Sequence, residues 1–327
     1  MQTDPTPDLY YQALNQYQAA QLLFEAIKLN IFSFLDKPAT AAEIAAGMGC
    51  HEKNVELLLL ALFSSGYIEK RDQHYCNTKE GAAYLSEASP YYLGKTILFR
   101  ETMTSLCNIA DQVRHGSKDF SGPWYDFSAL AEVTVPEMYA TGRVKSFAAE
   151  IKTIFPDASS QLKMLDLGGG SGVLAMEFSK NYPGSKAFVF ETPDVADTTK
   201  RILSKHHMEN RVSVLTGDFN TDDMGGPYDF IVASGILDFA TGDLNRFMGK
   251  IASALTDGGC FLLIGKFPEA EGRPTENMVS WLSGYMNGIK PPPSKKQVEA
   301  ALEQSRLQAV RLSQSGRFSG CFYKKAV

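Results

Sequence analysis

The segment 166–172 contains the residues with the clearest potential for chemistry. It joins an apolar run over residues 164–167, which predicts a short strand, to residues 173–181, whose apolar positions recur at helical spacing. A strand, a tight glycine turn and a helix can hold a nucleoside-bearing ligand over the helix N-terminus. A dinucleotide fingerprint would need its third glycine at Val173, so the spacing favours S-adenosylmethionine over NAD. The ligand contacts predicted here are Asp166, Gly168, Gly170 and Gly172.

The next predicted strands end on groups that suit the rest of such a ligand. Residues 186–190 read as a strand that leads into Glu191, whose carboxylate is placed to accept hydrogen bonds from both ribose hydroxyls. Residues 211–215 read as another strand, and the group that follows is expected to meet the adenine edge and face. That group consists of Gly217, Asp218 and Phe219. Residues 229–234 predict a buried strand whose last residue, Ser234, is included in the same cofactor site.

These motifs resemble those of the dimerising class I O-methyltransferases, the group that contains plant phenolic, acetylserotonin and bacterial polyketide methyltransferases. The residues that carry the resemblance are 166–172, 191–195 and 217–219, and it extends over almost the whole chain. The resemblance implies a Rossmann-like methyltransferase domain, S-adenosylmethionine as cofactor and a homodimer formed through the N-terminal domain. It does not identify the methyl acceptor.

The order of predicted elements divides the chain into two domains. Residues 1–110 contain three helices and two short strands, a pattern typical of a mainly α winged-helix domain. Residues 111–327 begin with a helical linker, 111–160, and continue with alternating strands and helices and a final hairpin. This alternation predicts an α/β fold with a mostly parallel sheet and one antiparallel strand. In the first domain, Thr40 and Glu43 predict a capping box at the start of a helix.

A winged helix often indicates DNA binding, but the charges here argue against it. The third predicted helix, residues 52–65, would enter the major groove, and Lys53 is the only Lys or Arg between positions 40 and 66. Binding to phosphates needs positive charge. The apolar run 57–63 instead predicts a helix buried on two sides. We therefore expect residues 1 to about 110 to form an intertwined homodimer.

Aromatic residues and methionines outside the cofactor motifs predict a substrate pocket. In the resembled family, the linker between the domains lines that pocket, whereas an aromatic stripe at helical spacing is also typical of a packed core, so both interpretations remain open. Residues 268–293 are expected to form a long loop over the pocket mouth. The predicted pocket residues are Phe99, Met103, Tyr125, Met138, Tyr139, Trp281 and Tyr285.

The resemblance also implies that the usual catalytic base is missing. In the resembled family, a histidine after the fourth strand removes the proton of the acceptor, and the matching run 236–239 has Leu237 at that place. Two other candidates remain. Asp238 would need a raised pKa to act as a base, and His115 is the only histidine expected to approach the pocket. The expected acceptor is therefore an acidic hydroxyl, a thiol or an activated carbon on a small aromatic or conjugated metabolite. A relative that binds the cofactor without transferring methyl groups stays open as the second interpretation.

Composition limits the other possibilities. The chain has 327 residues, of which 44% are hydrophobic and 21% are charged, as in a globular protein. A formal charge of -5 gives no reason to bind nucleic acid or an anionic membrane surface. The five cysteines are scattered and form no C-x-x-C pair, so neither a disulfide framework nor a metal site is expected. No apolar run is long enough to span a bilayer, and the N-terminus has no signal-peptide pattern, which predicts a cytoplasmic protein.

Overall fold

The computed structural model describes residues 5–116, 125–270, 274, 277–313 and 320–326. The chain forms two compact units, Met1–Glu101 and Thr102–Val327. Helix α6 (Gly94–Met103) contains the boundary between them.

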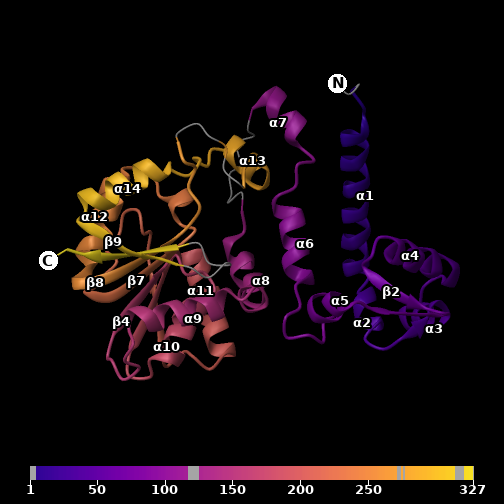
Figure 1. The fold of residues 1–327 in the computed structure, drawn as a ribbon, viewed down its shortest axis with the longest axis horizontal. Helices are drawn as coiled ribbons and strands as arrows, with labels where there is room; N and C mark the ends of the chain where they lie inside the picture. Colours follow the sequence, from indigo (N-terminus) through magenta and orange to yellow (C-terminus); the bar gives the residue numbers. More distant parts are fainter. Residues whose placement is uncertain (1–4, 117–124, 271–273, 275–276, 314–319, 327) are drawn as a thin grey trace. The chain divides into compact units, whose positions relative to one another are not determined.

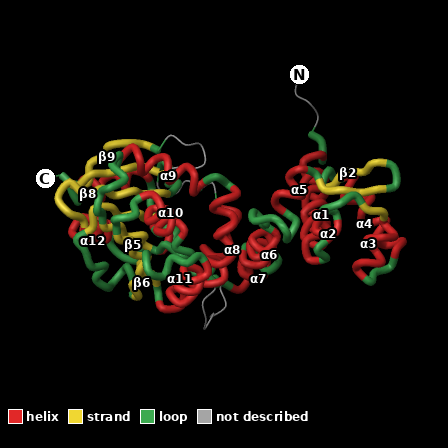
Figure 2. Tube along the Cα trace, turned by 90° about the horizontal axis from the view of Figure 1, so that it is seen from below, coloured by secondary structure: helices red, strands yellow, loops and turns green. Residues whose placement is uncertain are grey.

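The N-terminal unit is mostly helical with one small sheet (Figure 2). The sheet has the strand order β1-β3-β2, and β2 and β3 form the predicted antiparallel wing. Thr40 and Glu43 form both hydrogen bonds of a capping box, so the prediction for this helix start is confirmed. The elements are α1 (Asp8–Lys28), α2 (Ile31–Phe34), β1 (Ala39–Thr40), α3 (Ala41–Met48), α4 (Glu52–Ser64), β2 (Ile68–Arg71), β3 (His74–Asn77) and α5 (Lys79–Tyr84).

Two helices of this unit leave apolar side chains exposed within the single chain. Only the last turns of α1 are packed in the core, where Ala26 and Ile27 are buried. In α4, Leu59 and Leu62 are buried but their neighbours on the other side are exposed, so a single chain covers one side of this helix and leaves the other side for the predicted homodimer. The exposed side chains are Leu9, Tyr10, Tyr11, Leu14 and Tyr17 of α1 and Leu57, Leu60 and Phe63 of α4. We call these eight residues the apolar face.

The C-terminal unit is built on a seven-stranded sheet with the order β6-β5-β4-β7-β8-β10-β9 (Figure 1). All neighbouring pairs from β6 to β8 are parallel, and β10 is antiparallel to both of its neighbours. The predicted α/β class with one antiparallel strand is therefore confirmed. The strands are β4 (Lys163–Leu167), β5 (Lys186–Glu191), β6 (Val212–Thr216), β7 (Tyr228–Ser234), β8 (Leu255–Ile264), β9 (Leu307–Leu312) and β10 (Gly320–Lys325).

Helices cover both faces of this sheet because successive strand residues point to opposite sides. Met164 and Phe230 belong to one core cluster with residues of α9, α10 and α11, whereas Leu165 and Ile231 belong to another with residues of α12 and α14. Figure 1 shows the same two helical layers. The helices are α7 (Ile109–His115), α8 (Phe127–Ala140), α9 (Arg143–Ile154), α10 (Val173–Asn181), α11 (Pro193–Lys205), α12 (Leu244–Ala254), α13 (Met278–Met286) and α14 (Lys295–Gln304).

The structure corrects the prediction of a long loop over residues 268–293, because this stretch contains helix α13. The side chain of Gln112 on α7 donates from Nε2 to Ser283 Oγ at 3.2 Å and to Asn287 Oδ1 at 3.3 Å, which fixes this helix against α7. The final hairpin is confirmed as β9 and β10, although the predicted start of its second strand, residues 317–319, lies outside the described residues. None of the described helices is both long enough and apolar enough to cross a membrane.

Candidate functional site

The glycine turn lies after β4, where the strand order of the sheet reverses between β4 and β7. Ligands of open α/β sheets bind at the carboxyl ends of the strands next to such a reversal. Gly168, Gly170 and Gly172 all have positive φ values, of 65°, 53° and 69°, a conformation that glycine adopts without strain. A Cβ atom on Gly168 would lie 2.5 Å from Ile236 Cγ2, so this position also needs the absence of a side chain.

Hydrogen bonds from β5 and α11 hold the turn in place. The Gly168 amide donates to the Phe190 carbonyl at 2.9 Å, and the Gly170 amide donates to Glu191 Oε1 at 2.6 Å. From the other side, Thr199 Oγ1 donates to the Gly170 carbonyl at 2.6 Å. The turn is therefore fixed before any ligand arrives.

Glu191 ends β5 and is 7% exposed. Its second oxygen, Oε2, accepts the Thr192 amide at 3.1 Å. Burial raises the pKa of Glu191, and the amides of Gly170 and Thr192 oppose that rise. A carboxylate oxygen accepts more than one hydrogen bond, so both oxygens keep acceptor capacity beside the turn.

Asp166 lies beneath the turn and is 1% exposed. A Cβ atom on Gly169 would lie 2.5 Å from the carboxyl carbon of Asp166, so a side chain at position 169 would clash with this group. Neither carboxylate oxygen has a hydrogen-bond partner in the described structure. Burial raises the pKa of Asp166 to about 7, Glu191 adds to the rise, and the backbone amide of Ala175 opposes it without reaching hydrogen-bond geometry. A buried carboxyl group in this state favours a positive charge nearby.

The loop after β6 brings Asp218 to the same edge of the sheet as Glu191, because the Gly217 amide donates to the Glu191 carbonyl at 2.9 Å. Asp218 is exposed, and its Oδ1 accepts the backbone amide of Asn220 at 2.8 Å and Asn220 Nδ2 at 3.0 Å. Phe219 is 8% exposed and packs edge-on against Phe247 of α12. The structure thus places most of the Phe219 ring in the core and leaves little of it for a ligand.

Ser234 ends β7, the strand on the other side of β4, and its Oγ accepts Arg143 Nη2 at 3.4 Å. The structure therefore places the predicted cofactor residues at the ends of four adjacent strands, β6, β5, β4 and β7.

A cluster of four aromatic rings lies next to this edge, and we call it the aromatic wall. Phe239, which belongs to the short 3-10 helix Leu237–Phe239 after β7, lies 5.0 Å from Phe127 and 5.9 Å from Trp281 between ring centroids. Tyr125 closes the cluster, at 4.9 Å from Phe127 and 5.4 Å from Trp281. Three separate segments thus bring two of the predicted pocket residues, Tyr125 and Trp281, into contact with each other.

Asp238 directly precedes Phe239 of the aromatic wall. Burial raises the pKa of this carboxyl group to about 6. No hydrogen bond or ion pair of Asp238 is found within the part of the chain that the structure describes. A half-buried carboxylate of this kind can accept a proton near neutral pH. His115, the other candidate, has a side chain that is 69% exposed and lies 3.7 Å from Asp111 on the same helix, so its surroundings are those of a surface residue.

Two other predicted pocket residues, Met138 and Tyr139, contact α10 or the core cluster that contains it. Met138 packs against the core cluster that contains α10, and Tyr139 contacts Lys180 near the end of that helix, with the Lys180 Nζ atom 5.8 Å from the ring centroid. Tyr285 lies on α13, one turn beyond Trp281. Phe99 and Met103 lie on α6, at the boundary between the two units, and remain predictions.

Sequence reasoning missed four residues that shape this site. Phe239 ends the run 236–239, and Phe127 belongs to the aromatic linker, so an aromatic residue at either position was a usable signal. Asn220 follows Asp218 by two positions, a spacing at which an aspartate often accepts the next backbone amide. Lys250 gave no signal, because its role depends on how α12 packs under the loop.

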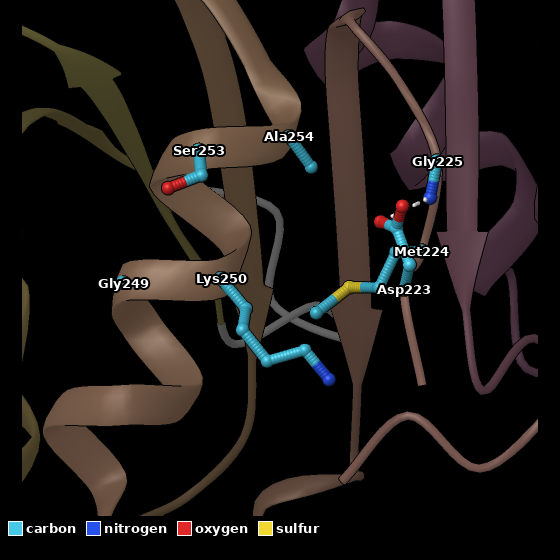
Figure 3. A pocket seen from close by; sticks show the side chains of 7 residues that line it. All are labelled: Asp223, Met224, Gly225, Gly249, Lys250, Ser253 and Ala254. Carbon is cyan, nitrogen blue, oxygen red and sulfur yellow. Dashed lines mark hydrogen bonds between the residues drawn. The ribbon is translucent and has the colours of Figure 1, made fainter. Parts of the chain in front are cut away.

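Lys250 lines a pocket of about 340 Å³ between α12 and the segment before β7 (Figure 3). The Lys250 side chain extends from α12 toward Asp223 and Met224, and Nζ donates to the carbonyls of Phe219 at 2.8 Å and Asp222 at 2.7 Å. None of the predicted site residues lines this pocket. Through these two hydrogen bonds, Lys250 holds the loop after β6 against α12. No group of three or more potential metal ligands is found among the described residues.

Comparisons with known proteins agree with this geometry. A model of the O-methyltransferase domain matches residues 144–287, and a model of the O-methyltransferase dimerisation domain matches residues 11–87. Together the two matches cover more than half of the chain. The acetylserotonin O-methyltransferase of Macaca mulatta is 28% identical in an alignment 287 positions long, and the match covers 80% of this chain and 82% of that protein.

Solved structures share the fold over the full length. An O-methyltransferase family protein from Burkholderia thailandensis has a TM-score of 0.80 at 17% identity and covers 98% of both chains. Human N-acetylserotonin methyltransferase, solved in complex with S-adenosylmethionine, has a TM-score of 0.72 at 24% identity and covers 100% of both chains. At these identities the structural likeness establishes the fold alone. With the two domain matches in the same order along the sequence, the chain belongs to the S-adenosylmethionine-dependent O-methyltransferase family that carries an N-terminal dimerisation domain.

Proposed function

We propose that this protein is a homodimeric methyltransferase that methylates an acidic hydroxyl or a thiol on a small aromatic or conjugated metabolite. The observation that carries the proposal is that Asp238, a half-buried residue whose carboxyl pKa is raised by burial, directly precedes Phe239 of the aromatic wall, next to the strand ends where the cofactor residues converge. Methyl transfer is an in-line displacement, so the protein must mainly hold donor and acceptor at close distance and in line.

The residues at the strand ends suit S-adenosylmethionine. The glycine turn would receive the methionine part of the cofactor, Glu191 the ribose hydroxyls and Asp218 the adenine edge. The unpartnered carboxyl group of Asp166 beneath the turn fits a ligand with positive charges. When bound, the cofactor supplies a methyl group on a positively charged sulfur.

Asp238 would take the proton of the acceptor, while the acceptor's lone pair forms the new bond to the methyl carbon. Transfer of a proton from an ordinary phenol of pKa about 10 to a carboxylate of pKa about 6 costs about 5 kcal/mol, and from a thiol of pKa about 8.5 it costs about 3 kcal/mol. Because this cost falls as the acceptor becomes more acidic, the site favours acidic phenols and thiols. The aromatic wall favours a flat acceptor, which can stack on or meet the edges of its rings.

The direct test is transfer of a labelled methyl group from S-adenosylmethionine to a panel of phenols, thiols and pyrroles at pH 5–9. The single-turnover rate of the wild type should fall below about pH 6, where Asp238 becomes protonated. Asp238→Asn should lower that rate by a factor on the order of 100, the usual contribution of a general base, and should remove the decline near pH 6. Asp197→Asn, which changes an exposed aspartate of α11, is the matched control and should behave as the wild type.

The outcomes distinguish a general base at Asp238 from a purely structural Asp238 and from a protein that binds the cofactor without transferring a methyl group. A rate that follows only the ionisation of the acceptor and is unchanged in Asp238→Asn would leave Asp238 as part of the pocket wall. Glu191→Ala should lose both cofactor affinity and transfer, which distinguishes a failure of binding from a failure of chemistry. Binding of S-adenosylhomocysteine without transfer to any member of the panel would favour the second interpretation, a cofactor-binding or regulatory protein.

The homodimer is supported by the apolar face of the N-terminal unit. Tyr10 is 75% exposed in the single chain, and seven further apolar side chains on α1 and α4 are exposed with it. Many large apolar side chains exposed on one unit often mark an interaction site in soluble proteins. The match to the dimerisation domain spans residues 11–87, which include most of this face. A second copy of the chain is therefore the proposed partner.

Charges placed on the apolar face should convert the dimer to a monomer. Leu14 and Tyr17 lie about one turn apart on one side of α1, whereas Gln304 of α14 and Gln308 of β9 are exposed and lie outside the apolar face. Leu14→Glu/Tyr17→Glu should therefore halve the mass measured by light scattering at micromolar concentration, because buried unpaired carboxylates are costly. Gln304→Glu/Gln308→Glu adds the same charge and should remain dimeric. A wild type that is monomeric at this concentration would contradict the proposal.

A further inference from the structure

Asn220 joins the loop that carries Asp218 to the segment that carries Asp238. Its backbone amide and its Nδ2 atom both donate to Asp218 Oδ1, at 2.8 Å and 3.0 Å. Nδ2 also donates to the carbonyl of Phe239 at 3.3 Å, and Oδ1 accepts the amide of Thr241 at 2.7 Å. One half-buried side chain thus contacts both segments at once.

The chemistry of asparagine suits this position. Its side-chain amide has two N–H donors and one oxygen acceptor, and here one donor goes to each segment while the acceptor takes Thr241. Asn220 occupies only Oδ1 of Asp218. The other oxygen, Oδ2, makes no hydrogen bond within the described residues and belongs to an exposed side chain. Asp218 is therefore oriented by Asn220 with one oxygen left for a ligand.

Residues 236–241 depend on this contact. Their internal hydrogen bonds are Phe239 to Ile236 at 2.9 Å and Ala240 to Leu237 at 3.3 Å. Within the described part of the chain, the hydrogen bonds that leave this segment all go to Asn220. The segment includes Phe239 of the aromatic wall, so the position of the wall is tied to the loop of Asp218.

We infer that Asn220 is a positioning residue that couples the ligand at Asp218 to the aromatic wall and Asp238. A nucleoside bound to Asp218 would hold that carboxylate still, Asn220 would then be fixed on one side, and residues 236–241 would become more ordered. The acceptor pocket would thus be completed by the cofactor. This inference rests on the proposed function in one respect, that Asp218 contacts the cofactor.

The test is hydrogen–deuterium exchange of the wild type and two variants with and without S-adenosylhomocysteine. In the wild type, the ligand should slow exchange of the amides in residues 236–241 by at least fivefold. Asn220→Ala should still bind the ligand, with a loss of affinity of no more than about tenfold, but the added protection of 236–241 should fall below twofold. Asn220→Asp keeps the size but loses both donors and should behave like Asn220→Ala.

A second readout uses the contact between Trp281 and Phe239. The chain has two tryptophans, so in a Trp124→Phe background the fluorescence comes from Trp281 alone. The ligand should change this fluorescence in the background protein but not after Asn220→Ala. Asn245→Ala, which changes an exposed asparagine of α12, is the matched control and should keep both responses.

The outcomes distinguish this inference from the proposed function. If the wild type does not bind S-adenosylhomocysteine, the proposed function fails and this inference fails with it. If the wild type binds but residues 236–241 gain no protection, or gain as much in both Asn220 variants, Asn220 is not a coupling residue and the proposed function stands. Slow amide exchange in β4 shows that a variant is folded. If one of the two Asn220 variants loses this protection, the inference is judged on the other variant.

Discussion

Gly168→Ala is expected to destabilise the C-terminal unit by about 2–5 kcal/mol and to weaken S-adenosylhomocysteine binding by at least tenfold. A non-glycine residue at its φ of 65° costs about 1–2 kcal/mol, and the new methyl group would lie 2.5 Å from Ile236 Cγ2, which adds an overpacking cost of about 1–3 kcal/mol. Since the Gly168 amide also donates to Phe190, the turn cannot shift without losing that hydrogen bond. Urea unfolding and calorimetry measure the two effects.

Gly235 provides a matched control for this substitution. Its φ is 69°, but a Cβ atom there would meet nothing within 4 Å, so Gly235→Ala should cost only the backbone term of about 1–2 kcal/mol. Adding Ile236→Ala to Gly168→Ala should recover part of the loss, with a coupling energy of about 1–3 kcal/mol in the double-mutant cycle. Equal losses for Gly168→Ala and Gly235→Ala would show that Ile236 does not restrict the turn.

Asp166→Asn is expected to change how the stability of the ligand-free protein depends on pH. The pKa of Asp166 is about 7 in the folded protein against 3.8 in the unfolded chain, so the folded state holds a proton that the unfolded state releases. The stabilisation that this group provides is therefore fully present below about pH 4 and is lost as the pH rises to about 7. Above pH 7, the ionisation of Asp166 no longer changes the free energy of unfolding. The loss amounts to about 4 kcal/mol, since each pKa unit corresponds to about 1.4 kcal/mol.

The experiment is urea unfolding at several pH values for the wild type and the variant. The difference in free energy of unfolding between Asp166→Asn and the wild type should grow in favour of the variant from pH 4 to pH 7. Titrating groups that do not interact with Asp166 cancel in this difference, whereas Glu191, which raises the pKa of Asp166, contributes to it. S-adenosylhomocysteine carries a positive ammonium group, so the variant should also bind it more weakly at pH 8 and nearly as well at pH 5. A difference that does not change with pH would mean that Asp166 is ionised in the folded protein throughout this range.

The fold was largely predictable because its signals are local. Helix α10 has the predicted bounds, since glycine and apolar spacing act within a few residues of each helix end. Helix α13 was not predicted. It lies between proline-rich stretches, and its contacts with Gln112 on α7 join positions far apart in the sequence. The apolar run 57–63 was recognised as more surface than one chain can bury, but the sequence pattern could not show which of its side chains face the core and which stay exposed, as Leu57 and Phe63 do.

The candidate site was predictable where it follows from strand ends. The turn after β4 and Glu191 after β5 meet because parallel strands finish at one edge, and the hydrogen bond between Gly170 and Glu191 joins them directly. The sequence did not show which side chains link one loop to another. Asn220 and Lys250 bind backbone carbonyls whose positions depend on the folded loop.

The position of β10 has a consequence for how the chain folds during synthesis. This strand comes last among the described elements, yet it lies between β8 and β9 and pairs with both. Its Phe322 is fully buried and stacks on Phe230 at a centroid distance of 6.4 Å. The ribosome must therefore release residue 325 before the sheet can be completed, whereas the N-terminal unit can fold while the rest is still being translated. Until β10 has left the ribosome, β8 exposes an unpaired edge to which a strand of another chain can pair.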